Sequence, residues 1–337
     1  MSKWYEDPHS DDTPIISSRV RLARNIKKYP FPIKLREKDA TKMISEMYEA
    51  VERGGAVFSR LNIEATDAAE ARSLLERHII SPEFFKSKNK KGLLLYENES
   101  AGVMLNEEDH IRIQAVCPGE SMDDAWSLAD KIDNLIEEQQ EYAFDKDFGY
   151  LTSCPTNTGT GLRASYMVHL PALEISGQLK NIIPAIAKFG MTVRGIYGEG
   201  SDSLGCVYQI SNQVTIGQSE HDIINALKNV TRQVIEREKT QAKKMFSEKN
   251  SEAEDRVYRA YGIASQARRM NSKEAMQLLS DIRMGFVNDI CKLPKPRLTI
   301  YNLMMNIQPG TLQKLCGKAF SGHERDAARA EYLRSNF

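Results

Sequence analysis

The sequence predicts an α+β fold in which an antiparallel sheet is flanked by helices, followed by an all-helical C-terminal domain. Segments in which apolar and polar residues alternate recur in the first two thirds of the chain. Three of them follow one another between residues 92 and 116, and connections this short favour antiparallel pairing. Later the alternation nearly vanishes and helical spacing takes over. We therefore expect an α+β domain at 14–241 and a helical domain at 242–337.

Each expected element follows from periodicity and from its punctuation by turn residues. Residues 1–14 form a loose lead-in that ends at Pro14. Asn98 and its neighbours predict a hairpin turn, and Ser219 with Asp222 predicts the capped start of a long helix. In chain order we expect a strand at 15–26, a helix at 37–53, a strand at 56–63, a helix at 66–80, strands at 92–98, 100–106 and 109–116, a helix at 123–142, a strand at 163–170, a helix at 176–189, and strands at 191–198 and 205–211.

Residues 154–171, which read CPTNTGTGLRASYMVHLP, carry the most distinctive pattern in the chain. A proline and two glycines predict turns, and the alternation that follows predicts a strand with one apolar and one mixed face. Arg163 stands at the start of this strand, after a loop that carries Cys154. A fixed cation beside a flexible loop is suited to holding an anion.

Two common nucleotide-binding motifs are excluded. Gly159–Ala164 matches G-x-G-x-x-A, but the dinucleotide fingerprint requires a strand before it, a helix after it and an acid about 20 residues on. Here a strand follows, and the nearest acid, Glu174, comes too early. The P-loop sequence G-x-x-x-x-G-K-[ST] does not occur.

Composition narrows the functional class. Lysine plus arginine and aspartate plus glutamate number 46 each, so net charge gives no argument for a nucleic acid or a membrane as direct partner. No apolar run approaches the ~18 residues that span a bilayer. The polar N-terminus excludes a signal peptide, and five scattered cysteines predict a reducing, cytoplasmic setting without disulfides or structural zinc.

Arginines recur at strand or loop positions. Taken singly, each has the character of an ordinary surface arginine. If several converge, their planar forks would neutralise a triphosphate without a P-loop. The five candidates are Arg19, Arg21, Arg112, Arg163 and Arg194.

A second candidate cluster reads N-E-E-D-H-I-R from residue 106 to residue 112. Strand parity predicts that Glu108, His110 and Arg112 share one face, with Ile111 and Ile113 directed to the core. An acid and a base would then stand side by side. Taken alone, an N-E-E-D turn is more typical of a solvated loop.

Together these motifs resemble the signatures of the phosphagen (guanidino) kinases. The matching segments are S-S-R-V-R at 17–21, N-E-E-D-H-I-R at 106–112, C-P-T-N with G-T and an arginine at 154–163, and R-G-I-Y-G-E at 194–199. The resemblance implies the catalytic-domain fold of that family and transfer of phosphate from ATP with Mg²⁺. It also implies that Glu108 and Glu199 bind the acceptor guanidinium, beside a tuning thiol at Cys154.

The resemblance further implies a set of nucleotide-binding residues and assigns no side chain to the metal. Glu199 points to an arginine-type acceptor, because creatine-specific members lack that acid. The implied nucleotide-binding residues are Ser17, Ser18, Arg19, Val20, Arg21, His78, Arg112, Arg163, Ala164, Ser165, Tyr166, Met167, Arg194, Gly195, Ile196, Tyr197 and Gly198. His78 is the least secure of these, since it also fits the end of a helix.

Two departures from the classical pattern point to one branch of the family. The helical domain that precedes S-x-R-x-R in classical members is missing, and a helical tail follows residue 241. Both features resemble the bacterial protein-arginine kinases. In the tail, R-D-A-A-R-A at 325–330 is similar to their allosteric phosphoarginine motif, which implies a pocket formed by Arg325, Asp326, Arg329 and Ala330. From spacing alone, an exposed salt-bridged helix is the more typical interpretation, and the family context favours the pocket.

The sequence therefore predicts an ATP-dependent kinase of arginine side chains in proteins. The family context implies marking of proteins for Clp-type degradation, control of a stress-gene repressor, a Clp ATPase and a small activator protein as partners, and a homodimer or higher oligomer. Alternatives are a kinase of free arginine, a non-catalytic adaptor that reads phosphoarginine, and nucleic-acid binding by the N-terminal arginines. Intact glutamates and arginines argue against the adaptor, and zero net charge argues against nucleic acid.

Overall fold

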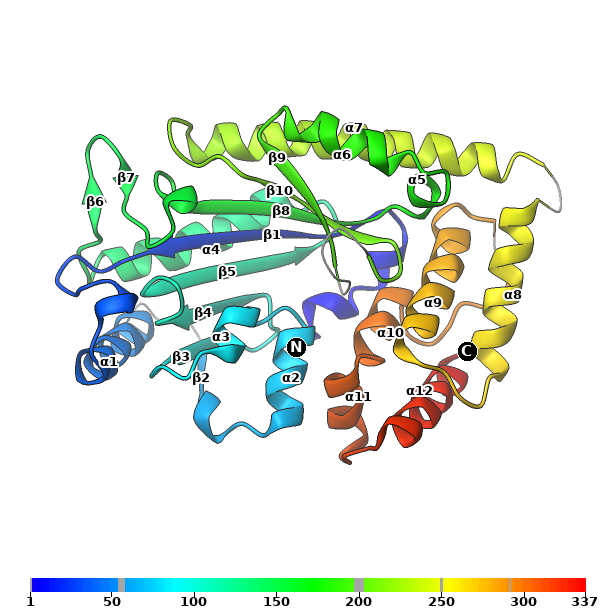
Figure 1. The fold of residues 1–337 in the computed structure, drawn as a ribbon, viewed down its shortest axis with the longest axis horizontal. Helices are drawn as coiled ribbons and strands as arrows, with labels where there is room; N and C mark the ends of the chain where they lie inside the picture. Colours follow the sequence, from blue (N-terminus) through cyan, green and yellow to red (C-terminus); the bar gives the residue numbers. More distant parts are fainter. Residues whose placement is uncertain (1, 54–57, 197–202, 249–250, 291) are drawn as a thin grey trace.

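The computed structural model describes residues 2–53, 58–196, 203–248, 251–290 and 292–337, and within them eight strands form one antiparallel sheet (Figure 1). Its strand order is β2-β3-β4-β5-β1-β8-β10-β9. The strands are β1 (Ile15–Arg24), β2 (Phe58–Leu61), β3 (Gly92–Tyr96), β4 (Ala101–Leu105), β5 (Ile111–Pro118), β8 (Leu162–His169), β9 (Met191–Gly195) and β10 (Val207–Asn212). A small separate hairpin comprises β6 (Phe144–Asp145) and β7 (Gly149–Tyr150). The predicted antiparallel α+β fold is confirmed.

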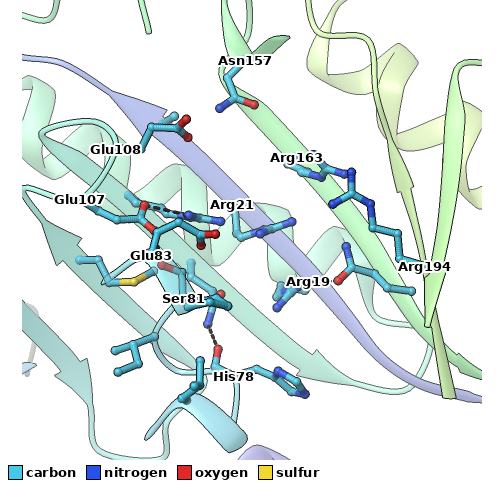
Figure 2. Close-up of a pocket in the computed structure, with 18 of the residues that line it drawn as sticks. Arg19, Arg21, His78, Ser81, Glu83, Glu107, Glu108, Asn157, Arg163 and Arg194 are labelled. Carbon is cyan, nitrogen blue, oxygen red and sulfur yellow. Dashed lines mark hydrogen bonds and ion pairs between the residues drawn. The ribbon is translucent and has the colours of Figure 1, made fainter. Parts of the chain in front are cut away.

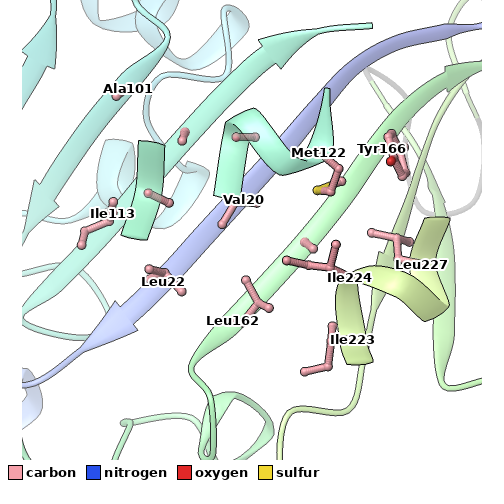
Figure 3. Close-up of a cluster of buried hydrophobic side chains, with 14 of the residues drawn as sticks. Val20, Leu22, Ala101, Ile113, Met122, Leu162, Tyr166, Ile223, Ile224 and Leu227 are labelled. Carbon is pink, nitrogen blue, oxygen red and sulfur yellow. The ribbon is translucent and has the colours of Figure 1, made fainter. Parts of the chain in front are cut away.

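Among the described residues, the helices that cover one face of the sheet include α1 (Glu37–Arg53), α4 (Met122–Glu137), α6 (Leu179–Ala187) and α7 (Glu220–Met245). The alternation in β1 produces this packing, because Val20 and Leu22 point to the covered face and are fully buried. Figure 3 shows both in the same buried cluster as Met122 of α4 and Ile224 of α7. The main core thus lies between this face and its helices.

The opposite face of the sheet carries the polar residues that alternate with these apolar ones. In the β1–β8 register Arg21 lies directly opposite Arg163, and in the β1–β5 register it lies opposite Gln114. Directly opposite residues of antiparallel strands project from the same face. The centre of this face therefore presents a cluster of cations.

Among the residues described after 250, five helices pack against one end of this second face. They are α8 (Glu252–Gln266), α9 (Ser272–Val287), α10 (Ile300–Asn306), α11 (Pro309–Cys316) and α12 (Gly322–Asn336). Ile16 and Met167 of the sheet share a core with Tyr301 of α10, whose hydroxyl donates to the Met167 sulfur at 3.1 Å. Helix α7 runs through the expected domain boundary at residue 241.

The C-terminal helices also fix a segment that borders the arginine-bearing face of the sheet. Helix α2 (Ala68–Glu76) ends in a buried carboxylate, Glu76, which accepts hydrogen bonds from the backbone N–H groups of Gly310 and Thr311 at the start of α11. An anion at a helix N-terminus satisfies donors that have no partner within the helix. The chain from α2 to α3 (Pro82–Lys86) is thereby anchored beside the arginine cluster.

Three predicted helices differ from the observed ones. The helix expected at 66–80 ends at Glu76, and His78 beyond it takes a positive φ of 59°. The helix expected at 176–189 is two helices, α5 (Pro171–Ile175) and α6 (Leu179–Ala187), because Gly177 takes a positive φ of 71° between them. Helix α4 ends at Glu137 rather than near residue 142, because Tyr142 turns back to form a bridge with Ile26. Among the described residues, no helix is long and apolar enough to cross a membrane.

Candidate active site

A cavity of about 710 Å³ opens on the arginine-bearing face of the sheet (Figure 2). Neighbouring strands supply its cations, with Arg19 and Arg21 on β1, Arg112 on β5, Arg163 on β8 and Arg194 on β9. All five arginines singled out from the sequence line this one cavity. Its size is that of a small-molecule or cofactor site.

Two of the cavity cations, Arg21 and Arg163, lack the full compensation that buried charges normally have, whereas Arg112 is paired with Glu107. The Nε atoms of Arg21 and Arg163 are buried and make no hydrogen bond to any described residue. Burial lowers the pKa of Arg21, with further lowering by Arg19 and Arg112. Like charges placed opposite each other on a sheet are destabilising, so a multivalent anion is the natural complement of this surface.

Glu108 supplies an acid at the rim of the same cavity. It lies in the turn between β4 and β5, and Figure 2 shows its carboxylate across the cavity from Arg163. Burial raises the pKa of Glu108, and the neighbouring charges of Asp109 and Glu107 raise it further. A carboxylate in this state is a better proton acceptor than an ordinary surface glutamate.

Glu107 was missed in the sequence, although it is the first acid of the N-E-E-D run. Both its carboxylate oxygens accept from the Arg112 guanidinium at 2.7 Å, and it also accepts from the Ser81 hydroxyl. These contacts and the Arg112 charge hold the pKa of Glu107 below its ordinary value. The two adjacent glutamates therefore have opposite tendencies, one paired and ionised, the other available to a ligand.

The predicted side-by-side pairing of Glu108 and His110 is wrong. Strand β5 begins only at Ile111, and Asn106 takes a positive φ of 61° in the preceding turn, so strand parity does not extend back to residue 108. His110 is fully buried. Its Nδ1 accepts from the backbone N–H of Ile26 at 3.0 Å, and Nε2 lies 3.0 Å from the carbonyl oxygen of Pro30. His110 thus organises the chain around the site.

His78, Gly195 and Ile196 belong to the predicted nucleotide-binding set, and all three line the cavity that holds the arginines. His78 lines the cavity with a positive φ of 59°, and burial together with Arg19 and Arg21 lowers its pKa to about 3. A neutral imidazole therefore faces the arginines. Gly195 and Ile196 line the same cavity. The predicted Tyr197, Gly198 and Glu199 lie outside the described residues.

Several residues of the predicted nucleotide set face away from the cavity. Val20, Ala164 and Tyr166 are in the core on the helix-covered face. The hydroxyl of Ser18 donates to the carbonyl oxygen of Gly119, so it closes a loop of the chain itself. Of the remaining members, Met167 lines the cavity, whereas Ser17 and Ser165 line a smaller hollow beside it.

Cys154 lines the same cavity as Asn157 and Glu108. Its sulfur lies 3.0 Å from the Thr156 hydroxyl. The loop that carries it is fixed by a hydrogen bond in which the backbone N–H of Ser153 donates to the buried carboxylate of Asp109 at 2.7 Å. The thiol is therefore placed by the same turn that presents Glu108.

The cavity suits a metal ion that arrives with its ligand. Among the described residues, no three His, Cys, Asp or Glu side chains cluster as a metal site. Mg²⁺ characteristically keeps several waters and binds through phosphates plus one or two carboxylates. The carboxylates of Glu83 and Glu108 face the cavity and match the one or two protein ligands that Mg²⁺ then needs.

The motif predicted for phosphoarginine lies on α12, where Arg325 and Arg329 are one turn apart as expected. Arg329 is fully buried and donates to the carbonyl oxygens of Ile307 and Met270 and to Asp326. Its remaining nitrogen, Nη2, and the Nε of Arg325 are buried with no hydrogen-bond partner among the described residues. Ala330 packs in the core beneath them.

Comparisons with known proteins agree along the whole chain. The sequence model of the ATP:guanido phosphotransferase C-terminal catalytic domain matches residues 39–241, and that of the protein-arginine kinase McsB C-terminal domain matches residues 250–337. A protein-arginine kinase of Caldanaerobacter subterraneus is 44% identical over 96% of both chains. That of Bacillus subtilis is 43% identical over 99% of this chain and 93% of its own.

Solved structures share the fold. A lombricine kinase matches with a TM-score of 0.59 at 22% identity, covering 66% of each chain. A duplicated taurocyamine kinase of Schistosoma mansoni matches with a TM-score of 0.62 at 20% identity, covering 79% of this chain and 39% of that one. The chain therefore belongs to the ATP:guanido phosphotransferase family and, within it, to the protein-arginine kinases.

Proposed function

We propose that this protein transfers the γ-phosphoryl group of ATP to arginine side chains of proteins. The observation that carries the proposal is a single cavity in which five arginines face a glutamate of raised pKa. The arginines match the triphosphate, and the carboxylate matches a guanidinium. Curated relatives that are 44% and 43% identical over nearly the whole chain carry the name protein-arginine kinase.

The chemistry requires that a poor nucleophile be activated and positioned. A guanidinium has a pKa above ~12 and is protonated at neutral pH. Glu108, with Glu199 as its proposed partner, holds the guanidinium so that one nitrogen points in line at the γ-phosphorus. As the N–P bond forms and the bond from phosphorus to the ADP oxygen breaks, the carboxylate accepts the proton that the nitrogen loses.

The cations of the cavity act on the other partner of the reaction. Arg21, Arg163 and Arg194 hold the phosphates and offset the charge that shifts between the attacking and leaving atoms. Mg²⁺ bound with the nucleotide supplies further neutralisation of phosphate charge. Cys154 lies beside the guanidinium and tunes its orientation, without forming a covalent intermediate.

The wider role follows from membership in the protein-arginine kinases. We propose phosphorylation of exposed arginines in cytoplasmic proteins as a mark for Clp-type degradation, with a stress-gene repressor among the substrates and a small activator protein as partner. A homodimer or higher oligomer is proposed as the working form. The free donors of Arg325 and Arg329 support a regulatory site for phosphoarginine on α12.

The direct test is mass spectrometry of an unfolded, arginine-rich protein after incubation with this chain and ATP, under conditions that spare the acid-labile P–N bond. We expect phosphoarginine on the protein. Glu108→Gln should abolish it while ATP binding is retained, because the cavity arginines remain in place. Rapid labelling of free arginine, with none on protein, would instead identify a kinase of small guanidino compounds.

A further inference from the structure

A second cavity, of about 410 Å³, adjoins the acceptor side of the active site. Glu107 and Glu108 line both cavities, so one wall separates them and carries the acceptor carboxylate. The far side of the second cavity is apolar and consists of Phe31, Pro32 and Ile33, which we call the shelf. The second cavity therefore lies directly beside the position proposed for the acceptor arginine.

The shelf leaves an apolar side chain uncovered next to the reacting groups. Ile33 is 92% exposed on a short 3-10 turn, Pro32–Lys34. Isolated exposed apolar residues are common on protein surfaces. Ile33 is distinguished from them because it borders a cavity that opens beside Glu108. An apolar group placed against it would remove surface from water and would be stabilised there.

The shelf is a fixed structure, held by the same buried histidine that supports the catalytic turn. His110 binds the backbone N–H of Ile26 through Nδ1, lies 3.0 Å from the carbonyl oxygen of Pro30 and stacks edge-on with Phe31 at 6.3 Å between ring centroids. The segment from Ile26 to Phe31 is thus tied at both ends to residue 110.

Asn25 and Asp109 complete this support from below. Asn25 accepts from the His110 backbone N–H at 2.9 Å and donates to the Asp109 carboxylate, which also receives the Ser153 N–H. One buried network therefore fixes the shelf, the turn that carries Glu108 and the loop that leads to Cys154. Preorganised contacts of this kind favour binding because little ordering remains to be done.

We propose that the shelf binds the residue next to the acceptor arginine in a protein substrate and that it selects an apolar side chain there. The proposal rests on the function proposed above. The occupant is a polypeptide because the cavity adjoins the acceptor site, and the chain on either side of a bound arginine must lie beside that site. The carboxylates of the shared wall disfavour an acidic neighbour by like-charge repulsion. The shelf thus sets a local sequence preference.

The test uses the full chain and three peptides that each contain one arginine, flanked on both sides by leucine, glycine or aspartate. We expect kcat/KM to be about tenfold higher for the leucine peptide than for the glycine peptide, the scale on which apolar subsites discriminate. The aspartate peptide should be the poorest. Equal rates on all three peptides would overturn the shelf proposal, whereas phosphorylation of none would overturn the proposed function itself.

Substitutions at Ile33 test whether the shelf causes the preference for the leucine peptide. Ile33→Asp should abolish the advantage of the leucine peptide while the rate on the glycine peptide and the melting temperature stay unchanged, since the side chain is exposed. Ile33→Leu should retain the preference. Ile33→Ser removes the apolar side chain without adding a charge and should also abolish the preference. Ile263→Asp, at an exposed position on α8, is the matched control and should change neither ratio. A preference that survives Ile33→Asp and Ile33→Ser would contradict the proposal.

The shelf has one other conceivable occupant, a second copy of this chain. Sedimentation of the wild type and Ile33→Asp distinguishes the two, because a substrate shelf leaves the oligomeric state unchanged. Loss of self-association in the variant, with its peptide preference intact, would assign the surface to an interface between copies and would overturn the proposal.

Discussion

Two sets of arginines in this molecule differ in what balances their charge. Arg24 and Arg283, each no more than 2% exposed, are paired with carboxylates of the same chain, Asp133 at 2.6 Å and Asp11 at 3.1 Å. Arg283 also donates to two backbone carbonyl oxygens. Such pairs are held by their geometry and by the cost of leaving either charge alone.

Two of the cavity arginines, Arg21 and Arg163, differ from this set in having no carboxylate of the described residues to balance their charge. Within the described part of the chain, no ion pair joins Arg21 or Arg163 to a carboxylate, and the two stand opposite each other across β1 and β8. The difference separates arginines that stabilise the fold from arginines that await an anion. It can be tested by asking whether stability and activity are lost in different variants.

The largest effect is expected on stability, at Arg283. Arg283→Met keeps most of the side-chain volume but leaves the carboxylate of Asp11 without its cation. We expect the free energy of unfolding to fall by about 3–5 kcal/mol, the usual cost of removing one partner of a buried pair. Denaturant unfolding followed by circular dichroism measures it. The folded fraction should bind ATP normally, and an unchanged unfolding midpoint would remove Arg283 from the structural set.

The opposite result is expected at Arg21. Arg21→Gln should lower kcat/KM by about 10²–10³-fold, as loss of one stabilising donor at a reacting group does. The melting temperature should stay the same or rise, because the variant removes a desolvated charge opposite Arg163. Steady-state kinetics and thermal unfolding measure the pair of effects. A variant that loses stability and keeps its activity would refute the distinction.

The fold was predictable because it follows from local patterns. Alternation identified the strands, and the short connections between residues 92 and 116 predicted their antiparallel order. The errors arose where a single residue broke the period. Gly177 divides one expected helix. Asn106 has a positive φ, so the strand alternation that predicted His110 beside Glu108 does not extend through this turn.

The active site was predictable to the extent that strand periodicity governs it. The arginines of β1, β5, β8 and β9 project from one face, as alternation requires. The roles of Glu107 and His110 could not be inferred, because both depend on contacts across long sequence separations, with Ser81 and Ile26. Hydrogen bonds of that kind are decided by the folded arrangement and not by spacing.

Helix α12 contains both kinds of arginine one turn apart, which offers a smaller test of the same comparison. Arg325→Ala should weaken binding of phosphoarginine about tenfold, a loss of ~1.4 kcal/mol, and leave stability unchanged. Arg329→Ala should destabilise the fold, because this side chain holds the carbonyl oxygens of Ile307 and Met270. Calorimetric titration with phosphoarginine and thermal unfolding measure the two outcomes. Equal loss of stability in both variants would contradict the assignment.

The smallest effect extends the comparison to carboxylates. Glu107 is balanced by Arg112, whereas burial and the charges of Asp109 and Glu107 raise the pKa of Glu108. Glu108 must be ionised to hold a guanidinium, so kcat/KM should fall tenfold per pH unit as the pH drops below that raised pKa. The acid limb of the profile should therefore lie above the ordinary glutamate value of ~4.3.

Glu83 provides a way to move that limb. Its charge contributes to the raised pKa of Glu108, although less than the charges of Asp109 and Glu107 do. Glu83→Gln should shift the acid limb of the kcat/KM profile to lower pH by a fraction of a unit, because Glu108 then ionises more easily. Glu236→Gln, on the exposed side of α7, is the control and should leave the limb in place. A limb that moves to higher pH in Glu83→Gln would show that another group limits the rate.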